Sequence, residues 1–307
     1  TRSVAVTGVQ TCALPIYPGP AAAAKQRAVA VALDWLRREG VVDTDTLEWL
    51  ADYKFSGNIW GYREGEIYFP NSPILIVEAP FAEAVLLETL VISVLNFDSA
   101  VASAASRMIN AAGGRRTAEM GSRRANETAA VAAARAAYVA GFDATSNLEA
   151  GRTWGVPTMG TAAHAFTLLH DSEEQAFRAQ VETFGPGTTL LVDTFDIEAG
   201  VRNAVAAAGT KLGAVRLDSG DLPVEVARVR KLLDELGAVD TKITVTNDLD
   251  EFAIAALAAA PVDAYGVGTS VVTGSGSPTA GFVYKLVAIE DEDGQQRSVA
   301  KTSAKKG

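Results

Sequence analysis

Residues 212–221 read LGAVRLDSGD, a short apolar run that passes directly into charge and glycine. The run from Leu212 to Leu217 has the length of a buried strand and holds a single charged residue, Arg216. The polar residues DSGD begin where such a strand would end. An arginine and two acids at the end of a buried strand predict a polar site there.

Two other segments have the same form, an apolar run followed by polar residues or glycine. They are LLVDTFD at residues 190–196 and VDAYGVGTS at residues 262–270, and alanine-rich helical stretches lie between them. Repeated strand–helix units of this kind build a parallel sheet or barrel, and functional residues gather at the carboxyl ends of its strands. The sequence therefore predicts an α/β fold with its site along that edge.

The remaining segments predict how the chain divides into domains. Residues 21–115 combine helical periods with short strands between residues 55 and 79 that glycine and proline interrupt, which favours a smaller α+β sandwich domain. Residues 116–276 hold the strand–helix series of a barrel. Residues 277–307 are expected to return as strands to the sandwich domain and to stop before an element is complete. Residues 1–20 show no clear period, are expected to be disordered or non-native, and are left out of the predicted fold.

Composition excludes several classes of protein. The chain has 307 residues, 37 acids against 27 bases and a net charge of −10, which argues against a general nucleic-acid or membrane-surface binder. Its single cysteine, Cys12, allows no disulfide within the chain and no cysteine-based metal site, as fits a reducing cytoplasm. Because we find no apolar run of the roughly 18 residues that a membrane helix needs, we expect a soluble cytoplasmic protein without a membrane partner.

The sequence contains two histidines, His164 and His170. His164 follows the small residues GTAA, which would leave its imidazole in an open loop, and an imidazole titrates near neutrality. It can therefore act as a base, a nucleophile or a phosphoryl acceptor. The alternative is a packed or surface histidine without a role. That alternative is more common for a lone histidine, and it is the interpretation for His170.

Arginines stand where an anionic ligand could bind, because a guanidinium group binds carboxylate or phosphate through two parallel hydrogen bonds. Arg123 and Arg124 follow a short predicted strand, and a solvated surface pair is an equally good interpretation. Arg216 lies inside an apolar run, where an unpaired charge would be costly, so we expect it to be paired or bound to a ligand. Asp218 and Asp221 could hold ribose hydroxyls or Mg²⁺, or this segment could cap a helix.

Residues 266–270, GVGTS, offer backbone N–H groups and two hydroxyls, which is the composition of a phosphate-binding loop. In barrels, phosphate commonly binds at the last strand–helix loops. A single Gly-x-Gly is a weak signal, so an ordinary tight loop is the alternative interpretation.

Taken in order, these segments and several others match one family. The matching segments are FSG at 55–57, EMGSRR at 119–124, AGFDATSN at 140–147, GTAAHAF at 160–166, LVDTFD at 191–196, VRLDSGD at 215–221, DLDEF at 248–252 and YGVGTS at 265–270. Their order and spacing are those of nicotinate phosphoribosyltransferase, and the chain resembles an actinobacterial-type member of that family from about residue 21 to its end. One departure is Asn247, which stands where many relatives have glycine.

The resemblance implies an irregular α/β barrel beside a smaller α+β sandwich domain, in a cytoplasmic homodimer with sites at the subunit interface. It implies a reaction in which nicotinate displaces pyrophosphate from 5-phosphoribosyl-1-pyrophosphate and gives nicotinate mononucleotide for NAD salvage. ATP hydrolysis is coupled to this transfer, and Mg²⁺ accompanies the pyrophosphate. The resemblance does not identify protein ligands for the metal.

The resemblance also implies roles for individual residues. His164 is transiently phosphorylated by ATP, Arg123 and Arg216 contact nicotinate or the phosphoribosyl donor, and Asp218 holds the ribose. The implied set is catalytic His164, Arg216 and Asp218; substrate-binding Arg123, Arg124, Ser146, Thr161, Thr189, Asp193 and Ser219; and phosphate-binding Asp248, Gly266, Gly268, Thr269 and Ser270.

Two other functions stay open at this point. A quinolinate phosphoribosyltransferase shares the barrel but must hold a second carboxylate and does not use ATP, and His164 in its Gly-Thr-x-x-His segment favours nicotinate instead. The other is an inactive protein that retains phosphate binding. Ligand binding without formation of a mononucleotide would favour it.

Overall fold

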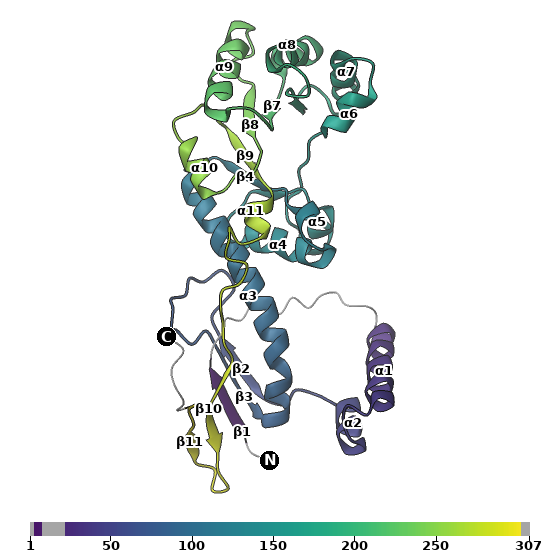
Figure 1. The fold of residues 1–307 in the computed structure, drawn as a ribbon, viewed down its shortest axis with the longest axis vertical. Helices are drawn as coiled ribbons and strands as arrows, with labels where there is room; N and C mark the ends of the chain where they lie inside the picture. Colours follow the sequence, from purple (N-terminus) through teal and green to yellow (C-terminus); the bar gives the residue numbers. More distant parts are fainter. Residues whose placement is uncertain (1–2, 8–21, 302–307) are drawn as a thin grey trace. The chain divides into compact units, whose positions relative to one another are not determined.

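The computed structural model describes residues 3–7 and 22–301, which belong to two compact units (Figure 1). The first unit comprises residues 1–96 and 281–307, and the second comprises residues 97–280. The division falls within helix α3 (Phe81–Ala112), whereas the sequence pattern predicts it at residue 115. Helix α3 therefore contributes its first half to one core and its second half to the other.

The first unit is built on an antiparallel sheet of five strands in the order β11-β10-β1-β3-β2. Helices α1 and α2 and the first half of α3 belong to the same unit. The bounds are β1 (Ser3–Thr7), α1 (Ala22–Glu39), α2 (Thr44–Ala51), β2 (Asn58–Gly61), β3 (Leu75–Pro80), β10 (Lys285–Glu290) and β11 (Gln296–Ser298).

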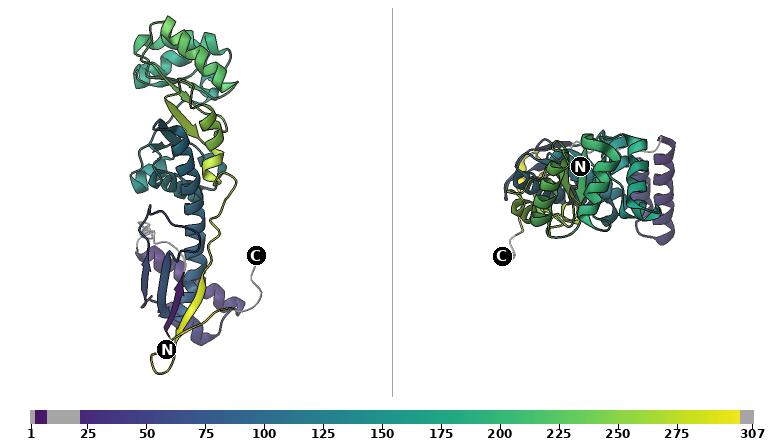
Figure 2. Two further views of the ribbon diagram at one scale, coloured as in Figure 1. Left: turned by 90° about the vertical axis from the view of Figure 1, so that its left-hand side faces the viewer. Right: turned by 90° about the horizontal axis from the view of Figure 1, so that it is seen from above.

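Strand β1 contradicts the prediction that residues 1–20 lie outside the fold. The structure places Ser3–Thr7 in the sheet, where it pairs with β10 on one side and β3 on the other (Figure 2). A strand of five residues has little signal of its own, since its stability comes from the strands beside it. Residues 8–20, and with them most of the segment expected to be non-native, lie outside the described residues.

The core of the first unit joins β3 to α3. Burial alternates along β3, as expected for a strand with one face covered. The buried residues of α3 that meet it recur at helical spacing, which gives the helix one apolar face. This cluster comprises Ile74, Leu75, Val77, Ala79, Ala84, Val91 and Leu95.

Helix α3 corrects one expectation from the sequence. By length and composition it is able to cross a membrane, so the statement that no such stretch exists is wrong. Core helices of soluble proteins pass the same test. Val91 and Leu95 lie in the first core, and Val101, Ala104 and Met108 lie in the second, which is consistent with such a core helix.

The second unit contains a curled, half-barrel sheet of six parallel strands in the order β5-β4-β9-β8-β7-β6. Its α/β class agrees with the prediction, and β5 and β6 are its edge strands. The strand bounds are β4 (Arg116–Glu119), β5 (Ala144–Thr145), β6 (Thr189–Leu191), β7 (Ala214–Leu217), β8 (Lys242–Val245) and β9 (Ala264–Val267).

Helices follow the strands in turn, and α7, α8 and α9 lie side by side in chain order (Figure 1). The helix bounds are η1 (Ser122–Arg124), α4 (Glu127–Val139), α5 (Leu148–Trp154), α6 (His164–Leu169), α7 (Glu173–Phe184), α8 (Ile197–Ala208), η2 (Gly209–Lys211), α9 (Leu222–Glu235), α10 (Glu251–Ala256) and α11 (Thr269–Val272).

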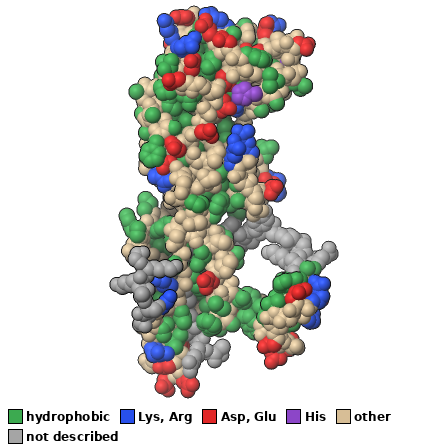
Figure 3. Space-filling view, in the orientation of Figure 1, with side chains coloured by type: hydrophobic (Ala, Val, Ile, Leu, Met, Phe, Trp, Pro, Cys, Tyr) green, Lys and Arg blue, Asp and Glu red, His purple; other side chains and the backbone are tan. Residues whose placement is uncertain are grey.

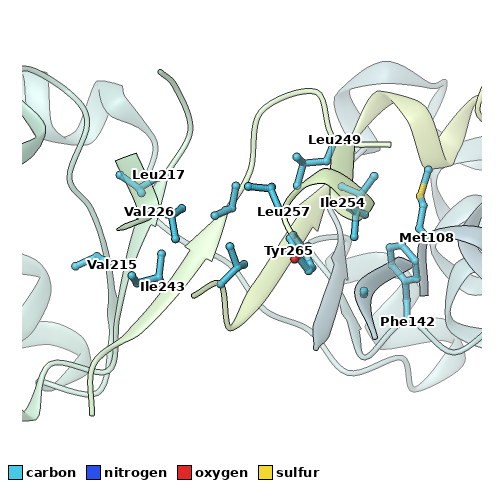
Figure 4. Packing of buried hydrophobic residues seen from close by; sticks show 14 of the residues in the cluster. Met108, Phe142, Val215, Leu217, Val226, Ile243, Leu249, Ile254, Leu257 and Tyr265 are labelled. Atoms are coloured by element: carbon cyan, nitrogen blue, oxygen red, sulfur yellow. The ribbon is translucent and has the colours of Figure 1, made fainter. Parts of the chain in front are cut away.

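The core of the second unit lies between this sheet and its helices (Figure 4). Val215 and Leu217 of β7, Ile243 of β8 and Tyr265 of β9 are fully buried. Continuous apolar runs of this kind are expected where both faces of a parallel sheet are covered. The rigid strands carry the polar residues that follow them to a common edge.

Candidate active site

Polar residues gather at the carboxyl edge of the six-stranded sheet. Because all its strands are parallel, their carboxyl ends lie at the same edge. The residues at or just after those ends are Glu119 (β4), Thr145 and Ser146 (β5), Asp193 (β6), Asp218 and Ser219 (β7), Thr246 (β8) and Gly268 (β9). The edge predicted from the sequence is therefore the one at which chemically active side chains meet.

Asp193 connects three segments of this edge. Its side chain is 1% exposed, and its Oδ1 lies 3.2 Å from His164 Nε2. Its Oδ2 accepts hydrogen bonds from the backbone N–H of Asp218 at 2.8 Å and from Ser219 Oγ at 2.6 Å. Asp193 can reach both neighbours because β6 and β7 pair directly, with Leu191 opposite Arg216. A buried carboxylate with three partners is well placed to orient an imidazole.

His164 is the first residue of α6 and its side chain is 39% exposed. The ring is therefore held by a buried carboxylate on one side and is open to solvent elsewhere, which differs from a packed histidine and from a free surface histidine. Figure 3 shows a histidine at the surface of the second unit, with basic side chains near it. His170, in contrast, has its Nδ1 2.8 Å from the carbonyl oxygen of Phe166, and the two rings pack edge to face.

Arg216 is a largely buried cation, with its side chain 12% exposed. It donates from Nη1 to Thr161 Oγ1, and its Nη2 lies 3.7 Å from Asp218 Oδ2. Its Nε is buried and has no hydrogen-bond partner among the described residues. Desolvation lowers the pKa of Arg216, the charges of Asp218 and Asp193 oppose that shift, and the charge of Arg123 adds to it. An anionic ligand could accept a hydrogen bond from the unpartnered Nε of Arg216 and could offset the repulsion between the guanidinium groups of Arg216 and Arg123.

The two acids after β7, Asp218 and Asp221, differ in their contacts. Asp218 accepts a hydrogen bond from Thr246 Oγ1 with Oδ1, so it is tied to the neighbouring strand. Asp221 is exposed at the start of α9, and its side chain makes no capping hydrogen bond. Ser219 donates to Asp193 instead of capping the helix. The capping interpretation of this segment is therefore not what the structure shows, and the Asp221 carboxylate is available to a ligand.

Arg123 and Arg124 lie on the short η1 turn directly after β4, and both are exposed. Ser146 follows β5, and its backbone N–H donates to the carbonyl oxygen of Glu119 at 2.8 Å. The pairing of β4 with β5 thus brings the turn with the two arginines next to the turn with Ser146.

The glycine segment after β9 has two different parts. Gly266 lies inside β9, where an added Cβ would come within 2.7 Å of Met120 Sδ and Thr246 Cγ2. Close packing therefore accounts for that glycine without a ligand. Gly268 precedes α11 in a more open position, where a Cβ would be 3.5 Å from the carbonyl oxygen of Met120. Thr269 and Ser270 begin that short helix, and their phosphate-binding role stays a prediction.

Asn247 and Asp248 form the turn after β8 with φ values of +88° and +45°. Both values lie in the left-handed region that favours glycine. Asn247, the position at which the family resemblance implies glycine, therefore stands where a glycine would fit without strain. Helix α10 follows this turn, and the Asp250 carboxylate caps it by accepting hydrogen bonds from the backbone N–H groups of Phe252 and Ala253.

Thr189 is a predicted site residue that the structure does not bring to this edge. It is the first residue of β6, so it lies at the amino end of that strand, and its carbonyl oxygen accepts a hydrogen bond from Gln180 Nε2 at 2.8 Å. The carboxyl end that carries the site begins after Leu191. Glu119, Thr145 and Thr246 were not among the predicted site residues, although each stands at the end of a short buried strand.

The comparisons with known proteins agree with these motifs. Residues 28–96 match the family described as nicotinate phosphoribosyltransferase (NAPRTase) N-terminal domain. Over 270 residues, the chain is 61% identical to the nicotinate phosphoribosyltransferase pncB1 of Mycobacterium tuberculosis. That alignment covers 85% of this chain and 60% of the relative, so the chain spans a little more than half of the length of that protein.

Two solved structures share the fold. A nicotinate-nucleotide pyrophosphorylase from Pyrococcus furiosus superposes with a TM-score of 0.77 and 24% identity, over 98% of this chain and 72% of the other. A human nicotinic acid phosphoribosyltransferase gives a TM-score of 0.74 and 24% identity, over 94% of this chain and 70% of the other. The resemblance of this chain to the nicotinate phosphoribosyltransferase family is thereby confirmed over 85% of its length.

Proposed function

We propose that this chain carries the site of a nicotinate phosphoribosyltransferase, which joins nicotinate to the phosphoribosyl group of phosphoribosyl pyrophosphate and releases pyrophosphate. The observation that carries this proposal is the buried Arg216 guanidinium, whose Nε is unpartnered among the described residues and which lies within electrostatic reach of Arg123. A buried guanidinium with an unpartnered N–H, near a second, exposed guanidinium, suits substrates that carry carboxylate and phosphate. The similarity to the mycobacterial enzyme supports the same reaction.

The proposed transfer needs positioning more than covalent catalysis. The ring nitrogen of nicotinate forms a bond to the anomeric carbon, and the bond from that carbon to the pyrophosphate oxygen breaks, with its electron pair leaving on pyrophosphate. Positive charge develops on the sugar, so a nearby carboxylate such as Asp218 would stabilise the transition state. Arg123 and Arg216 would hold the anionic groups in place.

His164 is the proposed acceptor of a phosphoryl group from ATP. A ring nitrogen would attack the terminal phosphorus of ATP, and ADP would leave with the electron pair of the broken bond. Asp193 supports this role because its buried carboxylate holds His164 Nε2 at 3.2 Å. The Asp193 carboxylate also accepts a hydrogen bond from the backbone N–H of Asp218, the proposed sugar-binding acid. Phosphorylation of His164 would therefore change the position of Asp218 through Asp193.

Mg²⁺ belongs to the same proposal. Within residues 3–7 and 22–301, no group of three or more His, Cys, Asp or Glu side chains forms a metal site by itself. Mg²⁺ commonly binds through one or two carboxylates together with substrate phosphates and water. Asp218 and Asp221 fit this pattern, and the ion would neutralise charge on the departing pyrophosphate.

A cytoplasmic homodimer is proposed from the family resemblance alone. Light scattering after size-exclusion chromatography tests it: a mass of one chain at micromolar concentration would contradict the dimer.

The function is tested by supplying nicotinate or quinolinate with phosphoribosyl pyrophosphate and Mg²⁺, with and without ATP. Formation of the mononucleotide from nicotinate, stimulated by ATP, supports the proposal, and His164→Ala should lose the stimulation while keeping slow transfer. Preference for quinolinate without ATP stimulation would support the sister enzyme. Binding of nicotinate mononucleotide without any product formation would support an inactive phosphate-binding protein.

A further inference from the structure

We propose that Glu119 is a positioning residue, whose buried carboxylate closes a ring of hydrogen bonds that holds the turn with Arg123 against the turn with Ser146. This inference rests on the proposed function, because it concerns how two of its substrate-binding turns are kept in place. Glu119 lies at the carboxyl end of β4 and is 0% exposed.

The ring can be followed atom by atom. Glu119 Oε1 accepts from the backbone N–H of Gly121, and Glu119 Oε2 accepts from Thr145 Oγ1 at 2.5 Å. Thr145 Oγ1 in turn accepts from the backbone N–H of Asn147 at 3.0 Å. Asn147 Nδ2 donates to Ser122 Oγ at 2.9 Å, and Ser122 follows Gly121 in the chain, which closes the ring.

The ring also reaches the elements behind both turns. Asn147 Oδ1 accepts from the backbone N–H of Ala150 at 2.9 Å and so caps α5. An added Cβ at Gly121 would lie 2.3 Å from Val272 Cγ1 and 2.7 Å from the carbonyl oxygen of Gly268. The turn therefore packs tightly against α11 and the glycine before it. One buried side chain thus connects the loops after β4 and β5, and close packing connects them to the loop after β9.

A carboxylate is the group that this position requires. Each oxygen of Glu119 faces a donor, one an amide N–H and the other a hydroxyl. Glutamine has the same shape, but with its oxygen toward the Gly121 N–H its amide N–H₂ would donate to Thr145 Oγ1, and the hydroxyl hydrogen of Thr145 would lose its acceptor. A buried donor left without an acceptor costs more than the hydrogen bond itself contributes. Desolvation raises the pKa of Glu119, and the hydrogen bonds from Thr145 and Gly121 oppose that shift because they stabilise the ionised carboxylate.

A fixed turn lowers the entropy lost when ligand binds, because Arg123 is already presented in a single arrangement. Without the ring, the segment from Gly121 to Arg124 keeps its sequence and charge but samples several arrangements. Loss of Glu119 should therefore weaken the binding of nicotinate, although no atom of Glu119 is exposed to it.

The experiment compares four variants of the full chain with the parent. Glu119→Gln and Thr145→Val break the ring, and Thr145→Ser retains the hydroxyl. Asp143→Asn is the matched control, because the Asp143 carboxylate accepts from the backbone N–H of Thr117 at 2.7 Å at the other end of β4. Circular dichroism verifies folding. Calorimetric titration with nicotinate measures affinity, and hydrogen exchange followed by NMR measures protection of the Gly121 and Asn147 amides.

Glu119→Gln and Thr145→Val are expected to lose about tenfold or more in nicotinate affinity and to exchange both amides faster. Thr145→Ser and Asp143→Asn should stay within about threefold of the parent. Parent-like affinity in both ring-breaking variants, or an equal loss in Asp143→Asn, would overturn the inference. If the parent binds no nicotinate, the proposed function fails. The amide exchange then decides the positioning role, and unchanged exchange overturns it.

Discussion

Replacement of Asp193 by Asn tests the arrangement on which the proposed chemistry depends. The carboxylate accepts three hydrogen bonds, from His164, Asp218 and Ser219. Asparagine has one acceptor oxygen and one donor group. Keeping the oxygen toward Asp218 and Ser219 turns the amide N–H₂ toward His164 Nε2. The imidazole must then accept at Nε2, so the orientation of its proton is reversed.

The magnitude follows from the burial of these contacts. A hydrogen bond to a charged group contributes about 1.5–3 kcal/mol to stability and a neutral one about 1 kcal/mol. The two part-buried bonds that Asp193 accepts from Asp218 and Ser219 become neutral, which costs roughly 1–4 kcal/mol in the free energy of unfolding. The contact with His164 is discounted, because that side chain is 39% exposed. We expect a loss of about 2 kcal/mol in stability, together with loss of ATP stimulation.

Urea unfolding followed by circular dichroism measures the stability, and the coupled assay with and without ATP measures the stimulation. Asp196→Asn is the matched control, because Asp196 caps α8 through the backbone N–H of Ala199, and asparagine caps a helix equally well. An Asp193→Asn protein with parental stability and parental ATP stimulation would refute the role of this carboxylate.

Further predictions concern single residues. Arg216→Lys should cost about 2 kcal/mol in transition-state binding, because lysine has no planar fork; unchanged kcat/KM would contradict it. Gly268→Val should weaken binding of nicotinate mononucleotide in titrations while circular dichroism shows a folded chain, and parental affinity would place the phosphate elsewhere. Glu173 is buried with Oε1 unpartnered among the described residues, and desolvation, with smaller effects of Asp196 and Asp193, raises its pKa. Because the carboxyl ionises more readily in the unfolded chain, the parent loses stability as pH rises above about 4.5, the ordinary pKa of glutamate. Glu173→Gln should therefore be more stable than the parent in urea unfolding at pH 8, and the difference in the free energy of unfolding should shrink toward pH 4.5. An equal difference at both pH values would show that ionisation of Glu173 does not cause it.

Much of the second unit could be predicted from local patterns. The apolar runs before Asp193, Asp218 and Gly268 are strands β6, β7 and β9, because buried parallel strands consist of short continuous apolar runs. The polar residues after them lie at one edge because parallel strands all end there. Thr189 was predicted to lie in the site, but it is the first residue of the three-residue strand β6. In so short a strand, a shift of two residues moves a side chain from the carboxyl edge of the sheet to the amino edge.

The first unit was less predictable. Strand β1 pairs with β3 and β10, which lie far from it in the sequence, and a strand of five residues has no periodicity that distinguishes it from a loop. Helix α3 contributes to both cores, so its apolar length marks two buried stretches within one helix. Local composition does not separate such a helix from one that could cross a membrane.

Residue chemistry and periodicity are local properties, and they were sufficient to predict the α/β class and the sheet edge at which the polar residues gather; the order and spacing of the motifs added the family resemblance. The contacts that make the edge into a site join residues that lie far apart in the chain. His164 meets Asp193, Arg216 meets Thr161, and Thr145 meets Glu119, each across more than 25 positions. Thr145 reaches Glu119 because β4 pairs with β5 in this register, and Asp193 and Arg216 share one edge because β6 pairs with β7. Strand order and register depend on packing of the whole sheet, and for that reason the partners of the buried carboxylates Asp193 and Glu119 became visible only in the folded chain.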